Sequence, residues 1–276
     1  MDFWENVEKF YRQNGSALVV GLDPVIEKLP DGIERNSDGI LKFIDQIVKS
    51  THDLVCAYKP NLAFFLAIGD DGLNILRKSI AIVKSYGDIP IILDAKFNDV
   101  GHTAKMYSDF AHRIGADAVT INPYIGRDTI APFVENDLGI ILLCATSNPN
   151  FADVEGIPLG NRRDDRPLYI EIARLTDEWS KFFNRRFGLV VGATHPDVFT
   201  RIRQNAPNSP FLIPGIGAQG GDISDYIEPS ITSDLFPPLI VSARSILYAS
   251  DKSDFADAAR KKTMELKDKI NYIIKK

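Results

Sequence analysis

The sequence predicts an α/β fold: a single (β/α)8 TIM barrel with a short N-terminal helix and a long loop after strand 5, in one domain spanning residues 1–276. Eight short apolar runs alternate with segments in which apolar residues recur at helical spacing. Polar or charged residues repeatedly follow the apolar runs, which is where the active sites of such barrels lie. No linker separates the runs, so one domain is expected.

The predicted strands are continuous apolar runs, as expected of parallel strands that are buried on both faces. Prolines mark several of their boundaries: Pro90 precedes the third run, Pro60 ends the second and Pro123 follows the fourth. The expected strands cover residues 16–24, 54–61, 91–96, 116–121, 138–145, 187–193, 210–217 and 238–244.

Helices are predicted between these strands from the spacing of their apolar residues. The first carries Phe3, Val7, Phe10 and Tyr11 and is expected to plug or flank the core. The expected helices cover residues 2–13, 39–48, 72–86, 102–114, 127–135, 169–183, 197–204 and 254–270. Residues 146–167 form the longest irregular stretch, and its place after a strand favours a lid.

Composition narrows the classes of partner and compartment. Lys and Arg number 32 and Asp and Glu 37, so a net charge of -5 provides no basic field for nucleic acid. Cys56 and Cys144 lie in apolar runs without metal-ligand spacing, which is typical of reduced core cysteines. No signal peptide and no run of roughly 18 apolar residues is found, so a soluble cytoplasmic protein without a membrane partner is expected.

The third predicted strand ends in Asp94 and Lys96, with Asp99 three residues further along. Because side chains alternate along a strand, the carboxylate and the ammonium should point the same way. A structural ion pair, with Asp99 as the N-cap of the next helix, is one interpretation. Buried ion pairs are poor stabilisers, however, because desolvation offsets most of their attraction, and this favours a functional role for Asp94 and Lys96.

Other strand ends repeat this design. Asp23 and Pro24 follow the first strand, where they could also start a turn. Lys59 is held extended by Pro60, although a lysine there could instead extend to solvent. Residues 214–221 are rich in glycine and include Gln219, and Arg244 ends the eighth strand. Loops after strands seven and eight commonly bind phosphate in these barrels, so a phosphate site is predicted there.

No metal or nucleotide-cofactor motif accompanies these charges. None of the four histidines stands at a predicted strand end beside a possible metal ligand, so no metal site is expected. Without a dinucleotide-binding fingerprint, no cofactor is expected either. The predicted chemistry therefore depends on the placement of charged side chains.

The D-x-K-x-x-D pattern of Asp94, Lys96 and Asp99 resembles the orotidine 5'-phosphate decarboxylase family, in its branch of longer (type 2) enzymes. Further motifs extend the resemblance, in the family's order, over most of the chain; they are Leu22-Asp23-Pro24, Lys59-Pro60-Asn61, residues 214–221 and Ala243-Arg244-Ser245. Phe97-Asn98 stands where the family commonly has Arg-Gly, and Ala243 where many relatives have Gly.

The resemblance implies decarboxylation of orotidine 5'-monophosphate to UMP, the last step of de novo pyrimidine biosynthesis. It implies that Lys96 stabilises the carbanion and protonates C6, and that Asp94 crowds the substrate carboxylate and holds the lysines. It implies that Asp99 and Thr103 complete the site of a neighbouring subunit, so that a homodimer is required.

The family's substrate contacts can be carried over in the same way. The resemblance implies ribose contacts from Asp23 and Lys59, a substrate contact from Asn61, contacts with the pyrimidine from Ser147 and Pro214, and phosphate contacts from Gln219, Gly220 and Arg244.

Three alternatives remain open from the residues. A Schiff-base aldolase would need a neutral Lys96, whereas adjacent carboxylates favour the ammonium. A metal-dependent sugar-phosphate lyase or epimerase could use the same scaffold. A catalytically silent nucleotide-binding barrel would bind UMP without turnover.

Overall fold

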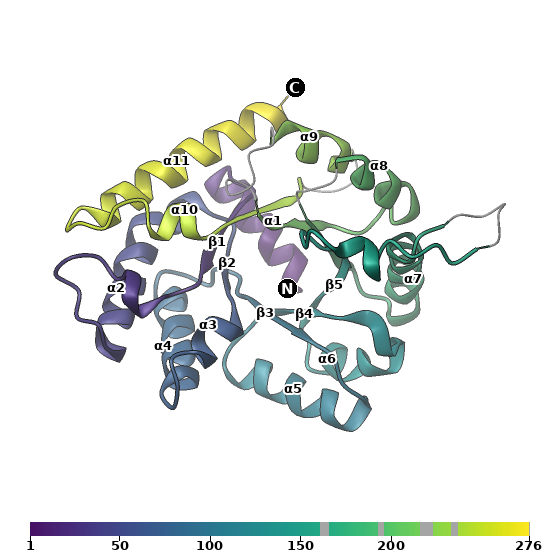
Figure 1. The fold of residues 1–276 in the computed structure, drawn as a ribbon, viewed down its shortest axis with the longest axis horizontal. Coiled ribbons are helices and arrows are strands. Elements are labelled where there is room, and N and C mark those ends of the chain that lie inside the picture. Colours follow the sequence, from purple (N-terminus) through teal and green to yellow (C-terminus); the bar gives the residue numbers. More distant parts are fainter. Residues whose placement is uncertain (161–165, 193–195, 216–222, 233–236, 276) are drawn as a thin grey trace.

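The computed structural model describes residues 1–160, 166–192, 196–215, 223–232 and 237–275. Within these ranges eight parallel strands form one sheet in the order β2-β1-β8-β7-β6-β5-β4-β3. Parallel bridges Tyr58↔Ile91 and Asn61↔Asp94 bring β2 back beside β3, which makes the sheet a barrel (Figure 1). The strands are β1 (Leu18–Leu22), β2 (Ala57–Pro60), β3 (Ile92–Phe97), β4 (Ala118–Ile121), β5 (Gly139–Ala145), β6 (Phe187–Val191), β7 (Phe211–Ile213) and β8 (Leu239–Ser242).

Helices surround the strands, as the alternating sequence pattern predicts (Figure 1). They are α1 (Phe3–Asn14), α2 (Ser37–Thr51), α3 (Leu62–Leu66), α4 (Gly72–Ser85), α5 (Gly101–Arg113), α6 (Ala131–Glu135), α7 (Leu168–Phe183), α8 (Pro196–Asn205), α9 (Ser224–Ile227), α10 (Arg244–Leu247) and α11 (Phe255–Ile274). The predicted fold class is confirmed. The short helices α3, α9 and α10 were not predicted, and the predicted helix 127–135 is divided into the 3-10 turn η4 (Arg127–Thr129) and α6.

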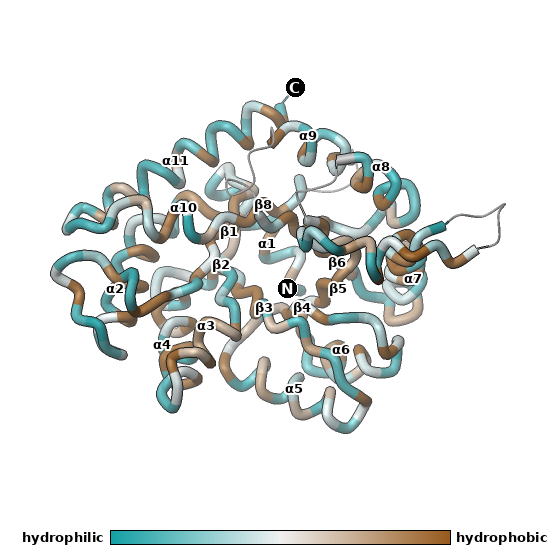
Figure 2. The backbone as a smooth tube through the Cα atoms, in the orientation of Figure 1, coloured by the Kyte–Doolittle hydropathy of each residue, from teal (hydrophilic) through white to brown (hydrophobic). Residues whose placement is uncertain are grey.

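The core lies between the barrel wall and the helices. Side chains of β1, β2, β4, β6, β7 and β8 are all buried, which explains why these strands read as continuous apolar runs. In Figure 2 the strands are mostly brown, whereas the outer sides of the helices are mostly teal. The helices therefore direct their apolar sides toward the barrel.

Helix α1 closes the end of the barrel where the strands begin. Asp2 caps the helix by accepting a hydrogen bond from the Glu5 backbone N–H at 2.8 Å. A Cβ on Gly139 would come within 2.4 Å of the Phe3 ring, and one on Gly188 within 2.6 Å of the Trp4 ring, so both aromatic rings lie directly on strand backbone. The predicted plug is thus formed by α1 against the starts of β5 and β6.

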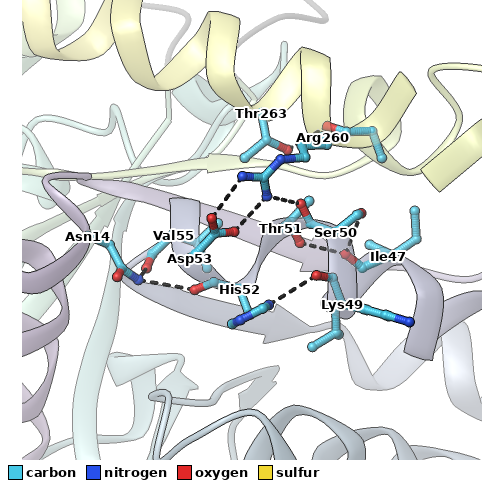
Figure 3. Close-up of polar contacts among 12 residues, drawn as sticks. Asn14, Ile47, Lys49, Ser50, Thr51, His52, Asp53, Val55, Arg260 and Thr263 are labelled. Carbon is cyan, nitrogen blue, oxygen red and sulfur yellow. Dashed lines mark hydrogen bonds and ion pairs between the residues drawn. The ribbon is translucent and has the colours of Figure 1, made fainter. Parts of the chain in front are cut away.

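A polar junction ties the last helix to the early part of the chain (Figure 3). Arg260 of α11 donates two hydrogen bonds to the Asp53 carboxylate, at 2.7 and 2.8 Å, and a third to the Ser50 carbonyl at 2.8 Å. These bonds hold the pKa of Asp53 below its usual value. Because the two side chains are 40% and 47% exposed, the ion pair should contribute about 1 kcal/mol or less to folding.

Candidate active site

The carboxylate of Asp94, the third residue of β3, is the centre of a charged cluster. Its Oδ2 accepts hydrogen bonds from Lys59 Nζ at 2.7 Å and Asn61 Nδ2 at 3.3 Å. Its Oδ1 accepts bonds from Lys96 Nζ at 2.6 Å and Thr120 Oγ1 at 3.0 Å. A carboxylate has about four lone-pair positions, so Asp94 is fully hydrogen-bonded. The structure therefore brings together Asp94, Lys96, Lys59 and Asn61 from the predicted set.

Mutual attraction keeps this cluster ionised despite its burial. Burial alone would raise the pKa of Asp94, but the charges and hydrogen bonds of Lys59 and Lys96 outweigh it and leave that pKa well below its usual value. Burial alone would lower the pKa of Lys59, but Asp94 and Asp23 together raise it. Both groups are therefore charged at neutral pH.

The two lysines differ in access to solvent. The Lys59 side chain is 6% exposed and the Lys96 side chain 44% exposed. Asp94 is the ion-pair partner of both, and the described residues offer Lys96 no second carboxylate within salt-bridge distance. An ammonium has three donors, so Lys96 keeps N–H groups for a bound molecule.

A cavity of about 220 Å³ adjoins the cluster. It is lined by charged and polar strand-end residues together with small ones; among them are Asp23, Lys59, Asn61, Asp94, Pro214, Ser242 and Arg244. Burial raises the pKa of Asp23, and its buried Oδ1 has no hydrogen-bond partner among the described residues. Arg244 was expected to end β8 but is exposed and begins α10, with Ala243 between it and the strand. The cavity thus has an unsatisfied acceptor on one strand end and a guanidinium on another.

The Ala243 methyl group is accommodated by a glycine on the neighbouring strand. A Cβ built on Gly21 of β1 would lie 2.5 Å from the Ala243 Cβ. The absence of a side chain at position 21 therefore provides the space that the methyl group fills.

The Phe97 side chain, at the end of β3, packs against two other aromatic rings. Its ring stacks on Tyr107 of α5 at a centroid distance of 4.6 Å and on Phe133 of α6 at 5.8 Å. This stack fixes the end of β3 against the two helices that follow it.

Within one chain, Asp99 and Thr103 make no hydrogen bond or ion pair with the described residues of the Asp94 cluster. The Asp99 Oδ1 accepts a hydrogen bond from the adjacent Val100 N–H at 2.8 Å, and α5 begins at Gly101 with Val100 as its N-cap. The alternative interpretation, in which Asp99 is the N-cap of this helix, is therefore wrong. Thr103 is half-buried in the first turn of α5.

Two of the remaining predicted residues, Ser147 and Pro214, follow the ends of other strands. Ser147 follows β5, and its backbone packs closely against Gly192: a Cβ built on Gly192 would lie 2.3 Å from the Ser147 backbone nitrogen. Gln219 and Gly220 lie outside the described residues. Within the predicted lid, the structure has a 3-10 turn η5 (Phe151–Asp153) and a bridge between Pro158 and Pro167.

Thr120 is the cluster member that sequence reasoning did not single out. It is 1% exposed, stands on β4 beside β3, and contacts Asp94 as well as backbone N–H groups of β3. A threonine in an apolar strand gives no signal of its own, because β-branched residues are common in strands.

Neither a metal-binding cluster nor a membrane-spanning helix is found among the described residues. They contain no group of three or more His, Cys, Asp or Glu side chains arranged to hold a metal ion. No helix formed by the described residues is both long enough and apolar enough to span a bilayer.

Comparison with known proteins identifies the family. Residues 16–259 match the model of the orotidine 5'-phosphate decarboxylase / HUMPS family. The chain is 40% identical to orotidine 5'-phosphate decarboxylase of Thermomicrobium roseum, over 100% of this chain and 97% of the relative. The structure resembles OMP decarboxylase of Leishmania donovani, with a TM-score of 0.84 and 32% identity over 99% of both chains.

A second solved structure shows the same barrel within a longer protein. Against UMP synthase of Leishmania donovani, the TM-score is 0.86 with 33% identity, and the match covers 99% of this chain and 56% of that one. The family match spans the strand ends that carry Asp23, Lys59, Asp94, Lys96 and Arg244. This chain, with its lysine-bound aspartate at the carboxyl end of a parallel barrel, belongs to the orotidine 5'-phosphate decarboxylase / HUMPS family.

Proposed function

We propose that the protein converts orotidine 5'-monophosphate to UMP and CO2, without a cofactor, as the last step of pyrimidine biosynthesis in the cytoplasm. The observation that supports this most directly is the Asp94 carboxylate, bound on one oxygen by the buried Lys59 and on the other by the accessible Lys96. The curated relatives at about 40% identity carry the name of this activity.

The reaction needs a fixed positive charge near C6 of the pyrimidine. When the bond between C6 and the carboxylate breaks, CO2 leaves and the electron pair stays on C6, where no π-system can delocalise it. A preorganised cation stabilises such a charge far better in a partly buried site than in water. Lys96 serves as this cation and then transfers a proton to C6, after which its neutral amine regains a proton from solvent.

Asp94 and Lys59 prepare Lys96 for this role. The bond of 2.6 Å from Lys96 to Asp94 fixes the position of the ammonium, and Lys59 balances the charge of the same carboxylate from the opposite side. A substrate carboxylate beside Lys96 would also lie close to the Asp94 charge, which crowds it.

The cavity residues bind the rest of the nucleotide. The buried Oδ1 of Asp23, which lacks a partner among the described residues, accepts a hydrogen bond from a ribose hydroxyl. Lys59 and Asn61 line the same cavity and also contact the substrate. Pro214 and Ser147 contact the pyrimidine. Arg244, with Gln219 and Gly220, binds the phosphate, because a guanidinium supplies paired donors for phosphate oxygens. Binding energy from the phosphate helps to position the pyrimidine at Lys96.

A homodimer completes each site with Asp99 and Thr103 of the partner. Support comes from the helix that follows Asp99 and carries Thr103: Val100, the N-cap of α5, is 58% exposed, and Met106 of α5 is 49% exposed. Exposed large apolar side chains on this element fit a subunit contact.

Mixing two inactive variants tests this shared site. Lys96→Ala and Asp99→Ala proteins, each inactive alone, should recover about a quarter of wild-type turnover after subunit exchange, because half of the dimers are mixed and each has one intact site. The matched control is a mixture of Lys96→Ala with Asp94→Ala, which should stay inactive because both residues act from one chain. Equal activity of the two mixtures would refute the shared site.

The decisive test of the function is the fall in orotidylate absorbance when pure protein is added in the presence of EDTA, with CO2 release measured in parallel. Turnover that is insensitive to the chelator is expected. Loss of activity with EDTA, restored by a divalent metal, would instead support a metal-dependent lyase. Binding of UMP without any CO2 release would support a silent nucleotide-binding barrel.

A further inference from the structure

The pairing of β3 with β4 is interrupted where the charged cluster begins. Ile92 pairs with Ala118 and Leu93 with Val119, but the next pair is Phe97 with Ile121. Residues 94–96 of β3 therefore stand opposite Thr120 alone, which is the arrangement of a β-bulge. At Lys96 the bulge has φ of +51°, in the left-handed region that non-glycine residues seldom adopt.

The Thr120 hydroxyl supplies the hydrogen bonds that the sheet has lost at this place. Its Oγ1 accepts bonds from the backbone N–H groups of Ala95 at 3.0 Å and Lys96 at 2.9 Å. The same oxygen donates to Asp94 Oδ1 at 3.0 Å. A hydroxyl has one donor and two acceptor sites, so all its capacity is used within the bulge.

These bonds hold both the backbone and the ammonium group of Lys96. The backbone N–H of Lys96 is bound to Thr120 Oγ1, and its Nζ is bound to Asp94 Oδ1, which is itself bound to Thr120 Oγ1. A closed ring of contacts thus runs from the hydroxyl through the carboxylate and the ammonium, and back along the lysine. Because Thr120 is 1% exposed, the described structure gives water little access to replace the hydroxyl.

We propose that Thr120 is a positioning residue for the decarboxylation, and this inference rests on the proposed function. Its hydroxyl holds Lys96 in the left-handed bulge and fixes the carboxylate oxygen that receives the ammonium. Thr120 is 1% exposed and its hydroxyl is fully used by hydrogen bonds within the bulge, so it acts on the reaction through Lys96 and Asp94.

A positioning role and a purely structural role make different predictions for kinetics. Misplacement of a catalytic group by about 1 Å can cost about 100-fold in rate. Loss of a hydroxyl that only stabilises the fold would lower thermal stability without changing kcat. A positioning hydroxyl should change kcat far more than KM, because the groups that bind ribose and phosphate remain in place.

The test compares Thr120→Val, which keeps the shape but removes the hydroxyl, with Thr120→Ser, which keeps the hydroxyl. We expect Thr120→Val to lower kcat about 100-fold with UMP affinity retained, and Thr120→Ser to restore most of the turnover. Thr263→Val is the control, because the Thr263 hydroxyl is also buried but bonds only within α11, to the Ala259 carbonyl. It should leave kcat unchanged.

Wild-type kcat in Thr120→Val, or an equal loss in Thr120→Ser, would overturn the inference. Should the valine variant fail to fold, Thr120→Cys takes its place, since a thiol is a poor substitute for both hydroxyl functions. An inactive wild type would refute the proposed function instead. A crystal structure of the variant then decides the inference alone: an undisturbed Lys96–Asp94 bond would overturn it, and a broken one would support it.

Discussion

Replacing Lys96 with alanine is expected to lower kcat for orotidylate by about 10⁴-fold or more, because one side chain supplies both electrostatic stabilisation and proton transfer. Each of these contributions is typically worth about 100-fold or more. Such a loss corresponds to about 5 kcal/mol of transition-state stabilisation. Lys96 is the expected reactive lysine because its side chain is 44% exposed, whereas that of Lys59 is 6% exposed.

Binding and folding should change little in the same variant. Affinity for UMP should be retained, since the cavity residues that face ribose and phosphate are unchanged, and the thermal midpoint should stay near that of the wild type. Lys181→Ala is the matched control, because Lys181 is an exposed lysine on α7 that also pairs with an aspartate. Substantial turnover in Lys96→Ala, measured as CO2 release with pure protein, would contradict the assignment of Lys96.

Replacing Asp94 with asparagine should damage both activity and stability. The neutral amide no longer compensates the buried Lys59 ammonium, and an NH2 group replaces one acceptor among four donors. Removing one partner of a buried ion pair typically costs about 3–5 kcal/mol of folding free energy. We also expect kcat to fall by about 100-fold or more, because Lys96 loses the group that fixes it.

The pH dependence of unfolding gives this prediction a direction. In the wild type the pKa of Lys59 is raised on folding, so its contribution to stability is present below its unfolded pKa and lost as pH rises through the folded pKa. The pKa of Asp94 is lowered on folding, so its contribution is present above its unfolded pKa and lost as pH falls through the folded one.

In Asp94→Asn the sign for Lys59 should reverse. Burial then dominates and lowers the pKa of Lys59 below its unfolded value of about 10.4. Between these two pKa values the unfolded chain binds more protons than the folded one. The free energy of unfolding of the variant, relative to that of the wild type, therefore rises with pH up to the unfolded pKa. Urea unfolding of variant and wild type between about pH 7 and 10 measures the difference. Asp53→Asn is the control, because it breaks the exposed pair with Arg260 and should cost about 1 kcal/mol or less at every pH. A pH-independent difference for Asp94→Asn would contradict the charged state of Lys59.

Much of the fold could be predicted because parallel barrels bury their strands on both faces. Each strand then appears as an apolar run, and the polar residue that ends it marks the carboxyl edge of the sheet. The cavity gathers Asp23, Lys59, Asp94, Pro214 and Arg244 from these edges. The one-turn helices α3 and α10 were missed because four or five residues are too few to show a helical period.

The bulge could not be predicted, because nothing local to Asp94, Ala95 and Lys96 requires it. Glycine would ordinarily mark a left-handed position, whereas here a lysine adopts it with help from Thr120 of the next strand. The partner lies 24 residues away along the chain, so a tertiary contact determines the backbone. The predicted meeting of the Asp94 and Lys96 side chains is confirmed at 2.6 Å, although the bulge interrupts the regular pairing of the strand.

Helix α1 lies at the opposite end of the barrel from the charged cluster, with Trp4 donating to the Arg186 carbonyl at 2.8 Å and Asn6 to the Asp88 carbonyl at 2.9 Å. The residues that pack the base of the barrel are thereby separated from the charged residues of the site along the barrel axis. Desolvation offsets most of the attraction between the ionic groups at the mouth, whereas aromatic packing at the base stabilises the barrel away from the charged cluster. Substitutions at the mouth are therefore expected to leave the packing of α1 at the base of the barrel in place.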